Sequence, residues 1–330
     1  MFTERRSTKI GAALLIFALV LRLSTGGAHA LSGANLGRLL LYLETGKVIH
    51  LPQIDPQPTE TSPAPTQPPA PDIPVFLPED MGYIDVMYAS DCYHRPALEA
   101  LLQKSLSWDL QSGEPAVLII HTHGSESYTK TLGQNYKESA SYRTLDCGYN
   151  MVAVGDALQK LLEEAGITVL HDRTLHDYPS YNDSYENSRE AAQEYLKQYP
   201  SIKMVLDLHR DAALNADGTQ YATQATVGGV SAAQLMLVVG TNASGRYHPN
   251  WQENLATALK LQVLMENACP GITRPVVLRA QRFNHDLAPG AMIVEVGTAG
   301  NTLAQAMASV PVLAQAIIAL AHGANPADMA

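Results

Sequence analysis

The chain has 330 residues, and 46% of them are hydrophobic, which is enough to build a substantial core and argues against disorder throughout. Acidic residues outnumber basic ones by 32 to 22, and the resulting formal net charge of -10 excludes a general attraction to nucleic acid. The three cysteines lie far apart and form no CxxC pair, so a cysteine-ligated zinc module and a dense disulfide scaffold are excluded.

The N-terminal segment, residues 1–30, has the pattern of an export signal or a membrane anchor. Basic residues precede an apolar run over residues 10–21, and residues 28–30, Ala-His-Ala, have the small-x-small form of a signal-peptidase site. As a helix the run would be about 18 Å long, against roughly 30 Å of membrane hydrocarbon, which favours a cleaved signal over a retained anchor. Both alternatives place the rest of the chain outside the cytoplasm, and the second also attaches it to the membrane.

Residues 31–83 are expected to form a low-complexity linker. Ten prolines fall between residues 52 and 78, mixed with Thr, Gln, Asp and Ser. Proline lacks the amide hydrogen that the interior of a strand or helix needs, so this composition favours an extended spacer. The folded domain is therefore expected over residues 84–330.

The folded part alternates strand patterns with helical patterns. Apolar runs at residues 116–120 and 203–208 are typical of buried parallel strands. Further strands are expected at residues 167–170, 235–239, 276–278 and 291–296, and helices at residues 150–165, 185–199, 251–267 and 302–321. This alternation predicts an α/β fold with a mainly parallel sheet flanked by helices. In such sheets, functional side chains gather beyond the carboxyl ends of the strands.

Histidines and an acid follow two of these strands. His121, His123 and Glu126 come directly after the first strand, and His209 follows the strand at residues 203–208. The HxxE spacing of His123 and Glu126, joined by a distant histidine, can supply two nitrogens and one carboxylate to Zn²⁺ and leave a fourth position for water. We expect His123 rather than His121 to be a ligand because it lies beyond the apolar run, and His121 to orient a ligand.

Glu295 lies inside the apolar strand pattern at residues 291–296. Burying an unpaired carboxylate is costly, so this side chain needs a partner, and a cation at the sheet edge would supply one. A buried structural ion pair is the alternative. We expect Glu295 to belong to the same site as the metal ligands.

Several stretches that contain these residues are similar to the stage II sporulation protein P family of bacterial cell-wall hydrolases. They are residues 118–128 (LIIHTHGSESY), 176–182, 205–212, 239–242, 248–251, 284–290 and 295–297. The resemblance implies a zinc amidase-like (phosphorylase/hydrolase-like) architecture, a Zn²⁺ cofactor, and N-acetylmuramoyl-L-alanine amidase activity on peptidoglycan, with endopeptidase activity also ascribed to the family. It further implies action at the sporulation septum during engulfment, with stage II sporulation proteins D and M as partners.

The resemblance adds an alternative ligand and a mechanism. Related zinc amidases often take the carboxylate ligand from near the start of the first helix, so Asp146 is an alternative to Glu126. In the expected mechanism, Glu295 accepts a proton from zinc-activated water and passes it to the leaving amine.

Arg210 and His285 are the candidate donors to the oxyanion that forms during amide hydrolysis. Arg210 could instead pair with its neighbour Asp211 in a structural ion pair. A polar loop at residues 176–181 could line a glycan groove or simply close a turn.

Two other functions fit the same residues. A zinc carboxypeptidase also uses HxxE, a distant histidine and a glutamate base, but it would release a single C-terminal amino acid. A non-catalytic cell-wall scaffold would not depend on Glu295 at all.

Overall fold

The computed structural model describes residues 84–324. The expected signal or anchor at residues 1–30 and the expected linker at residues 31–83 lie outside the described residues, so both stay predictions. The expected folded domain, residues 84–330, is described except for residues 325–330.

Seven strands form the central sheet. In spatial order they are β1 (Val86–Tyr88), β10 (Val276–Arg279), β9 (Leu235–Gly240), β11 (Gly290–Thr298), β6 (Met204–Asp211), β2 (Val117–Ile120) and β5 (Val169–His171). Strands β11, β6, β2 and β5 run parallel to one another, as do β9, β10 and β1. The two groups meet at one antiparallel pair, β11 with β9. The expected mainly parallel sheet is confirmed, and the antiparallel junction is an additional feature.

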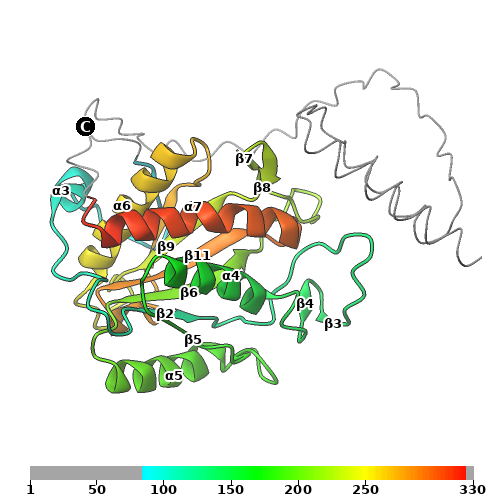
Figure 1. Ribbon diagram of the computed structural model, residues 1–330, viewed down its shortest axis with the longest axis horizontal. Helices are drawn as coiled ribbons and strands as arrows, with labels where there is room; N and C mark the ends of the chain where they lie inside the picture. Colours follow the sequence, from blue (N-terminus) through cyan, green and yellow to red (C-terminus); the bar gives the residue numbers. More distant parts are fainter. Residues whose placement is uncertain (1–83, 325–330) are drawn as a thin grey trace, which may run out of the picture. The chain divides into compact units, whose positions relative to one another are not determined.

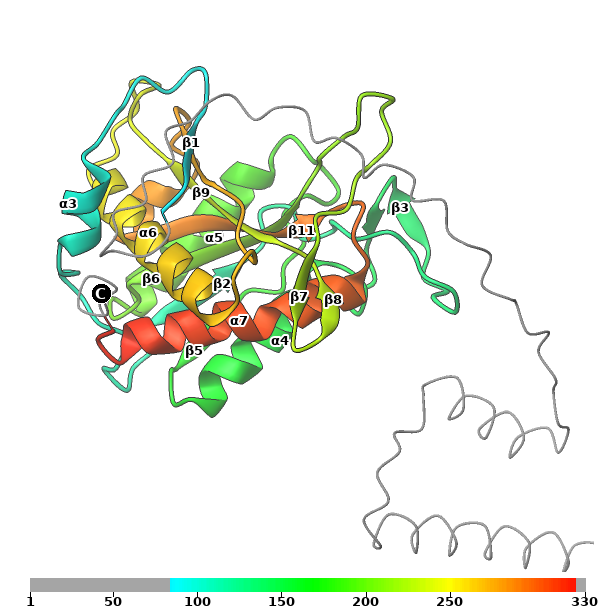
Figure 2. The same cartoon turned by 90° about the horizontal axis from the view of Figure 1, so that it is seen from above.

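Helices lie on both faces of this sheet (Figure 1). The helices α4 (Met151–Glu164), α6 (Trp251–Ala268) and α7 (Leu303–Ala321) pack on one face, and α5 (Ser184–Gln198) packs against β2 on the other. The short helix α3 (Leu98–Gln103) packs against α6. The hairpin of β7 (Ala225–Val227) and β8 (Val230–Ala232) lies beside α7 (Figure 2).

The strands and helices expected from the sequence are all present, with ends that differ by at most three residues. The elements that the sequence patterns did not predict are short. They are β1, α3, the β7–β8 hairpin, a hairpin of β3 (Glu138–Ala140) and β4 (Arg143–Thr144), and the 3-10 helix η1 (His285–Leu287). Short elements carry too few residues to show a period, which explains why they were missed.

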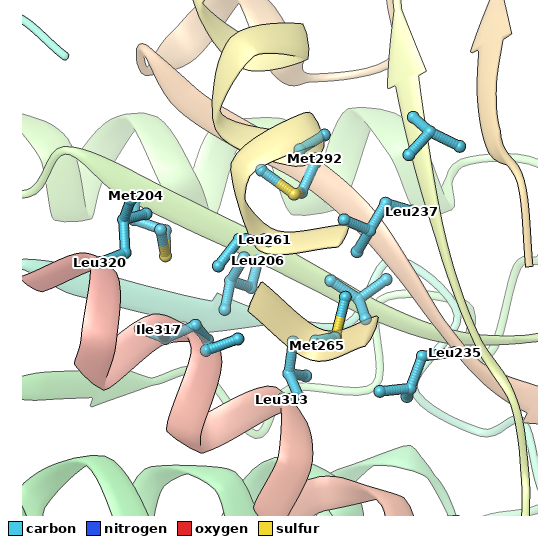
Figure 3. Packing of buried hydrophobic residues seen from close by; sticks show 14 of the residues in the cluster. Met204, Leu206, Leu235, Leu237, Leu261, Met265, Met292, Leu313, Ile317 and Leu320 are labelled. Atoms are coloured by element: carbon cyan, nitrogen blue, oxygen red, sulfur yellow. The ribbon is translucent and has the colours of Figure 1, made fainter. Parts of the chain in front are cut away.

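The main core lies between the sheet and the helices α6 and α7 (Figure 3). Strand pleating places Met204, Leu206 and Leu208 on the same face, where all three are buried, and α7 adds Leu313 and Ile317 to the cluster. Fully burying such a side chain stabilises the fold by about 1.5–3 kcal/mol. By length and composition α7 could cross a membrane, but half of its apolar window is buried within the domain, as in a core helix.

The opposite face of the sheet is only partly covered. Ala192 of α5 packs with Leu118 of β2 and Val205 of β6. A separate apolar cluster, which we call the open sheet face, consists of Met236, Val238, Val277 and Ile293, with Met87 and Phe283 packed against it. Among the described residues this cluster contains none from a helix. Within the described part of the chain, the open sheet face is therefore not covered by a helix, and its residues line a pocket that also contains Glu295.

Candidate metal centre

Three potential metal ligands from two separate stretches of chain meet beyond β2 and near the end of β6. The ligand atoms of His123, Glu126 and His209 all lie within 4.8 Å of one another. His123 Nδ1 lies 3.7 Å from Glu126 Oε1, and His209 Nδ1 lies 3.5 Å from Glu126 Oε2. Two imidazole nitrogens and one carboxylate are a donor set of catalytic zinc sites, which leave a further position for water. These three side chains, hereafter the candidate metal centre, therefore fit zinc.

Backbone hydrogen bonds fix the HxxE segment. The amide of Glu126 donates to the carbonyl of His123 over 3.1 Å, which closes the segment into a turn. The carbonyl of Glu126 accepts from the amide of Met151 over 3.0 Å, at the start of α4. The amide of Thr144 in β4 donates to the carbonyl of Ser125 over 2.8 Å. The loop after β2 is thereby tied to two other elements, which holds its potential ligands in place.

Two arginines hold the Glu126 carboxylate. Arg143 Nη2 lies 3.2 Å from Glu126 Oε1, Arg210 Nη1 lies 3.4 Å from the same atom, and the amide of Arg210 donates to Oε2 over 3.2 Å. Burial alone would raise the pKa of Glu126, but the charges of Arg210 and His209 lower it well below its usual range. Glu126 is therefore ionised at neutral pH, as a metal ligand must be.

Each of the three nitrogens of the Arg210 guanidinium has a partner within the protein. Besides Glu126, it donates to the carbonyl of Ser127 over 3.1 Å and to the carbonyl of Tyr142 over 3.1 Å. The alternative in which Arg210 pairs with Asp211 is wrong, because Asp211 accepts from Arg274 over 2.7 Å. The contacts of Arg210 orient Glu126, and its expected role as an oxyanion donor stays a prediction.

His209 lies between two carboxylates. Its Nε2 is 2.9 Å from Asp207 Oδ1, on the side away from Glu126. Asp207 in turn accepts from the amide of Thr122 over 2.7 Å and from its hydroxyl over 2.6 Å. Burial by itself would lower the pKa of His209, but the charges of Asp207 and Glu126 raise it well above its ordinary value. This favours a protonated ring in the metal-free protein, and metal binding at Nδ1 would displace that proton. A carboxylate behind a histidine is the arrangement that orients the ring of a metal ligand.

Sequence analysis missed Asp207. The signal was present, because this acid interrupts the apolar run of residues 203–208 just as Glu295 interrupts residues 291–296. The cost of burying a carboxylate applies equally to both residues, so both needed a partner.

Glu295 lies beside the candidate metal centre. In the pairing of β11 with β6 it is opposite His209, and both residues line a pocket of about 370 Å³ together with His123 and Glu126. Among the described residues its buried Oε2 has no hydrogen-bond partner. Burial raises the pKa of Glu295 to about 8. An unpartnered carboxyl with a pKa near neutrality is suited to accept and release a proton.

The other candidate residues lie outside this group of three. His121 is buried, with its Nε2 2.7 Å from His171 Nε2 and its Nδ1 3.2 Å from the carbonyl of Leu208. Asp146 is exposed and accepts from the amide of Gly148 over 3.0 Å. The structure thus groups His123 and Glu126, rather than His121 and Asp146, with His209.

His285 does not line the pocket that contains Glu295, although its ring lies 5.3 Å from that of Phe283, which does. Its Nδ1 accepts from the amide of Gly240 over 3.0 Å, and its side chain lines a separate small cavity with Asp207 and Thr122. Burial lowers the pKa of His285 to about 3, so the ring is neutral at physiological pH. Its expected role as an oxyanion donor stays a prediction.

The polar loop at residues 176–181 forms a wall beside the candidate metal centre. The ring of Tyr181 stacks on His123 with centroids 4.7 Å apart, and Asp177 accepts from Arg143 over 2.5 Å. Arg143 therefore connects this loop to Glu126, a role that sequence analysis did not anticipate. Burial lowers the pKa of His123 to about 4, which leaves it neutral and able to bind a metal.

Comparison with solved structures aligns this chain with several amidases. The N-acetylmuramoyl-L-alanine amidase AmiC2 of Nostoc punctiforme aligns with a TM-score of 0.39 and 10% identity, over 63% of this chain and 97% of that chain. The CwlD amidase of Clostridioides difficile, solved in complex with the GerS lipoprotein, aligns with a TM-score of 0.38 and 13% identity, over 61% and 96% of the two chains. The catalytic domain of CwlV from Bacillus (Paenibacillus) polymyxa var. colistinus aligns with a TM-score of 0.36 and 15% identity, over 62% and 96%.

Sequence comparison identifies the family. The Stage II sporulation protein P of Bacillus subtilis (strain 168) is 30% identical over 199 residues, which is 57% of this chain and 46% of that protein. The aligned region thus spans less than half the length of this curated relative. The model of the Stage II sporulation protein P (SpoIIP) family matches residues 59–318, which include all seven strands of the central sheet and the candidate metal centre. The chain therefore belongs to the SpoIIP family.

Proposed function

We propose that this chain is a zinc-dependent peptidoglycan hydrolase, specifically an N-acetylmuramoyl-L-alanine amidase that acts in sporulation. The observation that carries the proposal is the meeting of His123, Glu126 and His209 beside the unpartnered carboxyl of Glu295 in one pocket. The assignment to the SpoIIP family supports a cell-wall substrate. Location outside the cytoplasm at the septum, action during engulfment, and cooperation with stage II sporulation proteins D and M belong to the same proposal.

The candidate metal centre and the residues that contact it have separate roles in amide hydrolysis. A zinc ion held by His123, Glu126 and His209 supplies Lewis-acid polarisation of an amide carbonyl and a lowered pKa for water. Asp207 holds the His209 ring. Arg143 and Arg210 contact the Glu126 carboxylate, and the charge of Arg210 favours its ionised form.

Glu295 carries the proton transfers of the reaction. Its carboxylate accepts a proton from the attacking water and returns it to the amine of L-alanine as the lactyl amide breaks. A pKa of about 8 suits both steps, because the carboxyl exchanges protons readily near neutral pH. One residue can therefore act first as the base and then as the acid.

The products of peptidoglycan digestion test this proposal. Sacculi are incubated with the full chain and one equivalent of Zn²⁺, and the soluble products are separated and identified by mass spectrometry. The amidase proposal predicts free stem peptides with a new N-terminal alanine, and glycan strands with free lactyl groups. His209→Ala is expected to abolish these products. His322→Ala, which removes an exposed histidine at the end of α7, is the matched control and is expected to retain them.

Other products would identify the alternative functions. Release of single C-terminal amino acids, with every lactyl amide intact, would replace the amidase with a carboxypeptidase. An absence of any product, with wall binding equal in the wild type and in Glu295→Gln, would favour a non-catalytic scaffold.

A further inference from the structure

The open sheet face continues away from the candidate metal centre as the floor of the pocket that contains Glu295. Met236, at the start of β9, is paired with Glu295, and Val238 and Val277 continue the same face along β9 and β10. Side chains in a strand alternate between faces, so Arg279 points to the same face as Val277. Arg279 indeed lines this pocket. The pocket therefore reaches from the candidate metal centre to the far end of β10.

A second pocket adjoins the first at this far end. It has a volume of about 670 Å³ and is lined by Arg246 and Arg282, and it shares Tyr185 and Phe283 with the first pocket. The side chain of Gln281, which also lines it, accepts from Arg279 Nε over 3.3 Å. We call Arg246, Arg279 and Arg282 the arginine group.

The arginine group has little compensating negative charge. Among the described residues, neither Arg246 nor Arg279 has a carboxylate within ion-pair distance. Arg282 Nε lies 3.3 Å from Asp286, but that carboxylate already accepts two hydrogen bonds of 2.8 Å from Arg189. Glu186 is the acidic residue that lines the second pocket. Asp91 lies nearby, because it accepts from Gln281 over 2.7 Å, but among the described residues it makes no ion pair with the arginine group.

The backbone that carries the arginine group is fixed to the sheet. A Cβ at Gly240 would lie 2.6 Å from the carbonyl oxygen of Arg282, so the segment after β10 crosses directly over the end of β9. The amide of Ser244 donates to the carbonyl of Ala280 over 3.1 Å, which ties the loop of Arg246 to the same place. Guanidinium groups on a fixed backbone lose less freedom when they bind an anion.

We propose that the arginine group is a subsite for the carboxylates of an acidic peptide, which lies extended along the open sheet face with its other end at the candidate metal centre. From Met236 to Gly240 the strand advances four residues, or about 13 Å, which matches about four residues of an extended peptide. Carboxylates are the preferred partners of guanidinium groups, and the apolar floor would contact the peptide's aliphatic parts. The inference rests on the proposed function, in which this ligand is the stem peptide of peptidoglycan.

The experiment compares two forms of one substrate. Disaccharide tetrapeptides are released from peptidoglycan with a muramidase, and half of the material is amidated at its carboxyl groups with carbodiimide and ammonia. Steady-state hydrolysis by the full zinc-loaded chain is measured for both forms. The wild type is expected to show a KM about tenfold lower for the acidic form, with kcat within about twofold, as for an interaction made equally in the ground state and the transition state. In Arg246→Gln/Arg279→Gln/Arg282→Gln this preference is expected to disappear.

Two controls separate a carboxylate subsite from general effects. Lys160→Gln/Arg173→Gln/Lys197→Gln removes the same charge from α4, α5 and the loop after β5, and is expected to keep the preference. Arg279→Lys keeps the charge and is expected to retain most of the preference. If the wild type hydrolyses both forms with equal KM, or if the triple arginine variant keeps the preference, the subsite is refuted while the amidase stands.

Binding tests the subsite independently of hydrolysis. Isothermal titration calorimetry of the isolated acidic tetrapeptide with the full chain is expected to show binding that weakens about tenfold in the triple arginine variant. Such binding without any hydrolysis would refute the amidase and keep the subsite. Equal binding by the wild type and the triple variant would refute the subsite regardless of activity.

Discussion

His209 and Glu295 occupy paired positions on the adjacent parallel strands β6 and β11. Paired positions in a sheet direct their side chains to the same face, so the pairing brings a potential metal ligand and an unpartnered carboxyl into one pocket. A slip of one residue in either strand would move one of the two side chains to the helix-covered face. The chemistry proposed for the pocket therefore depends on the register of these two strands.

Removal of the carboxylate behind His209 is expected to weaken metal binding. In Asp207→Asn the contact of 2.9 Å to His209 Nε2 loses its charge, so the ring is less strongly oriented and less basic. We expect the affinity for Zn²⁺ to fall about 10–100-fold, measured by competition with a chromogenic chelator. Asp286→Asn, which changes a carboxylate outside the candidate metal centre, serves as the control. An unchanged affinity in Asp207→Asn would show that the Asp207 carboxylate does not support metal binding through His209.

The pH dependence of hydrolysis is expected to report Glu295. As a base, the carboxyl must be ionised, so kcat/KM rises as the pH increases toward its pKa, which burial raises to about 8. A cation bound at the candidate metal centre favours the ionised form of Glu295. It therefore shifts this rise in kcat/KM to lower pH. Glu295→Gln cannot titrate and should lose kcat about 10²–10⁴-fold together with the acid limb. A Glu295→Gln variant with the wild-type pH profile would exclude this residue as the base.

The ion pair of Arg143 and Asp177 is expected to stabilise the wall beside the candidate metal centre. Asp177 is buried and accepts from Arg143 over 2.5 Å, so Arg143→Gln leaves a buried carboxylate without its cation. We expect the free energy of unfolding to fall by about 3 kcal/mol, measured by urea denaturation. Adding Asp177→Asn removes the unpaired charge and should restore part of that loss. Simple additivity of the two changes would show that the pair contributes nothing.

Two buried histidines are expected to make the fold sensitive to mild acid. Burial lowers the pKa of His248 to about 4 and of His285 to about 3, whereas both rings have ordinary values near 6.5 when unfolded. The unfolded state therefore binds more protons below pH 6.5, so the stability present at neutral pH is lost as the pH falls toward 4. The free energy of unfolding should decrease by up to about 1.4 kcal/mol per pH unit for each ring.

Comparing variants isolates this titration from the others in the chain. Urea unfolding at pH 7, 6 and 5 is expected to give a shallower pH dependence for His248→Gln than for the wild type. His322→Gln changes an exposed histidine and should leave the dependence as it is. Equal slopes for the wild type and His248→Gln would show that folding does not shift the pKa of His248.

Much of the fold follows from local patterns. The apolar runs predict β2 and β6, and the helical spacing predicts α4 and α6, because burial of one face imposes a period of two or 3.6 residues on the sequence. The antiparallel pairing of β9 with β11 has no corresponding pattern in the sequence. Both directions bury the same alternating side chains, so the choice is made by the connections and packing of the whole sheet.

The candidate site likewise depends partly on the sequence and partly on the tertiary structure. The sequence by itself determined the types of residue that chemistry needs: the HxxE pair of His123 and Glu126, a histidine at a strand end, and an acid inside the strand pattern at residues 291–296. Only the tertiary structure decided which of them meet. It left Asp146 on the surface, directed Arg210 to Glu126 and placed His285 at the end of β9. The reason is physical: strand order and register set distances between residues far apart in the chain, whereas composition and spacing constrain only near neighbours.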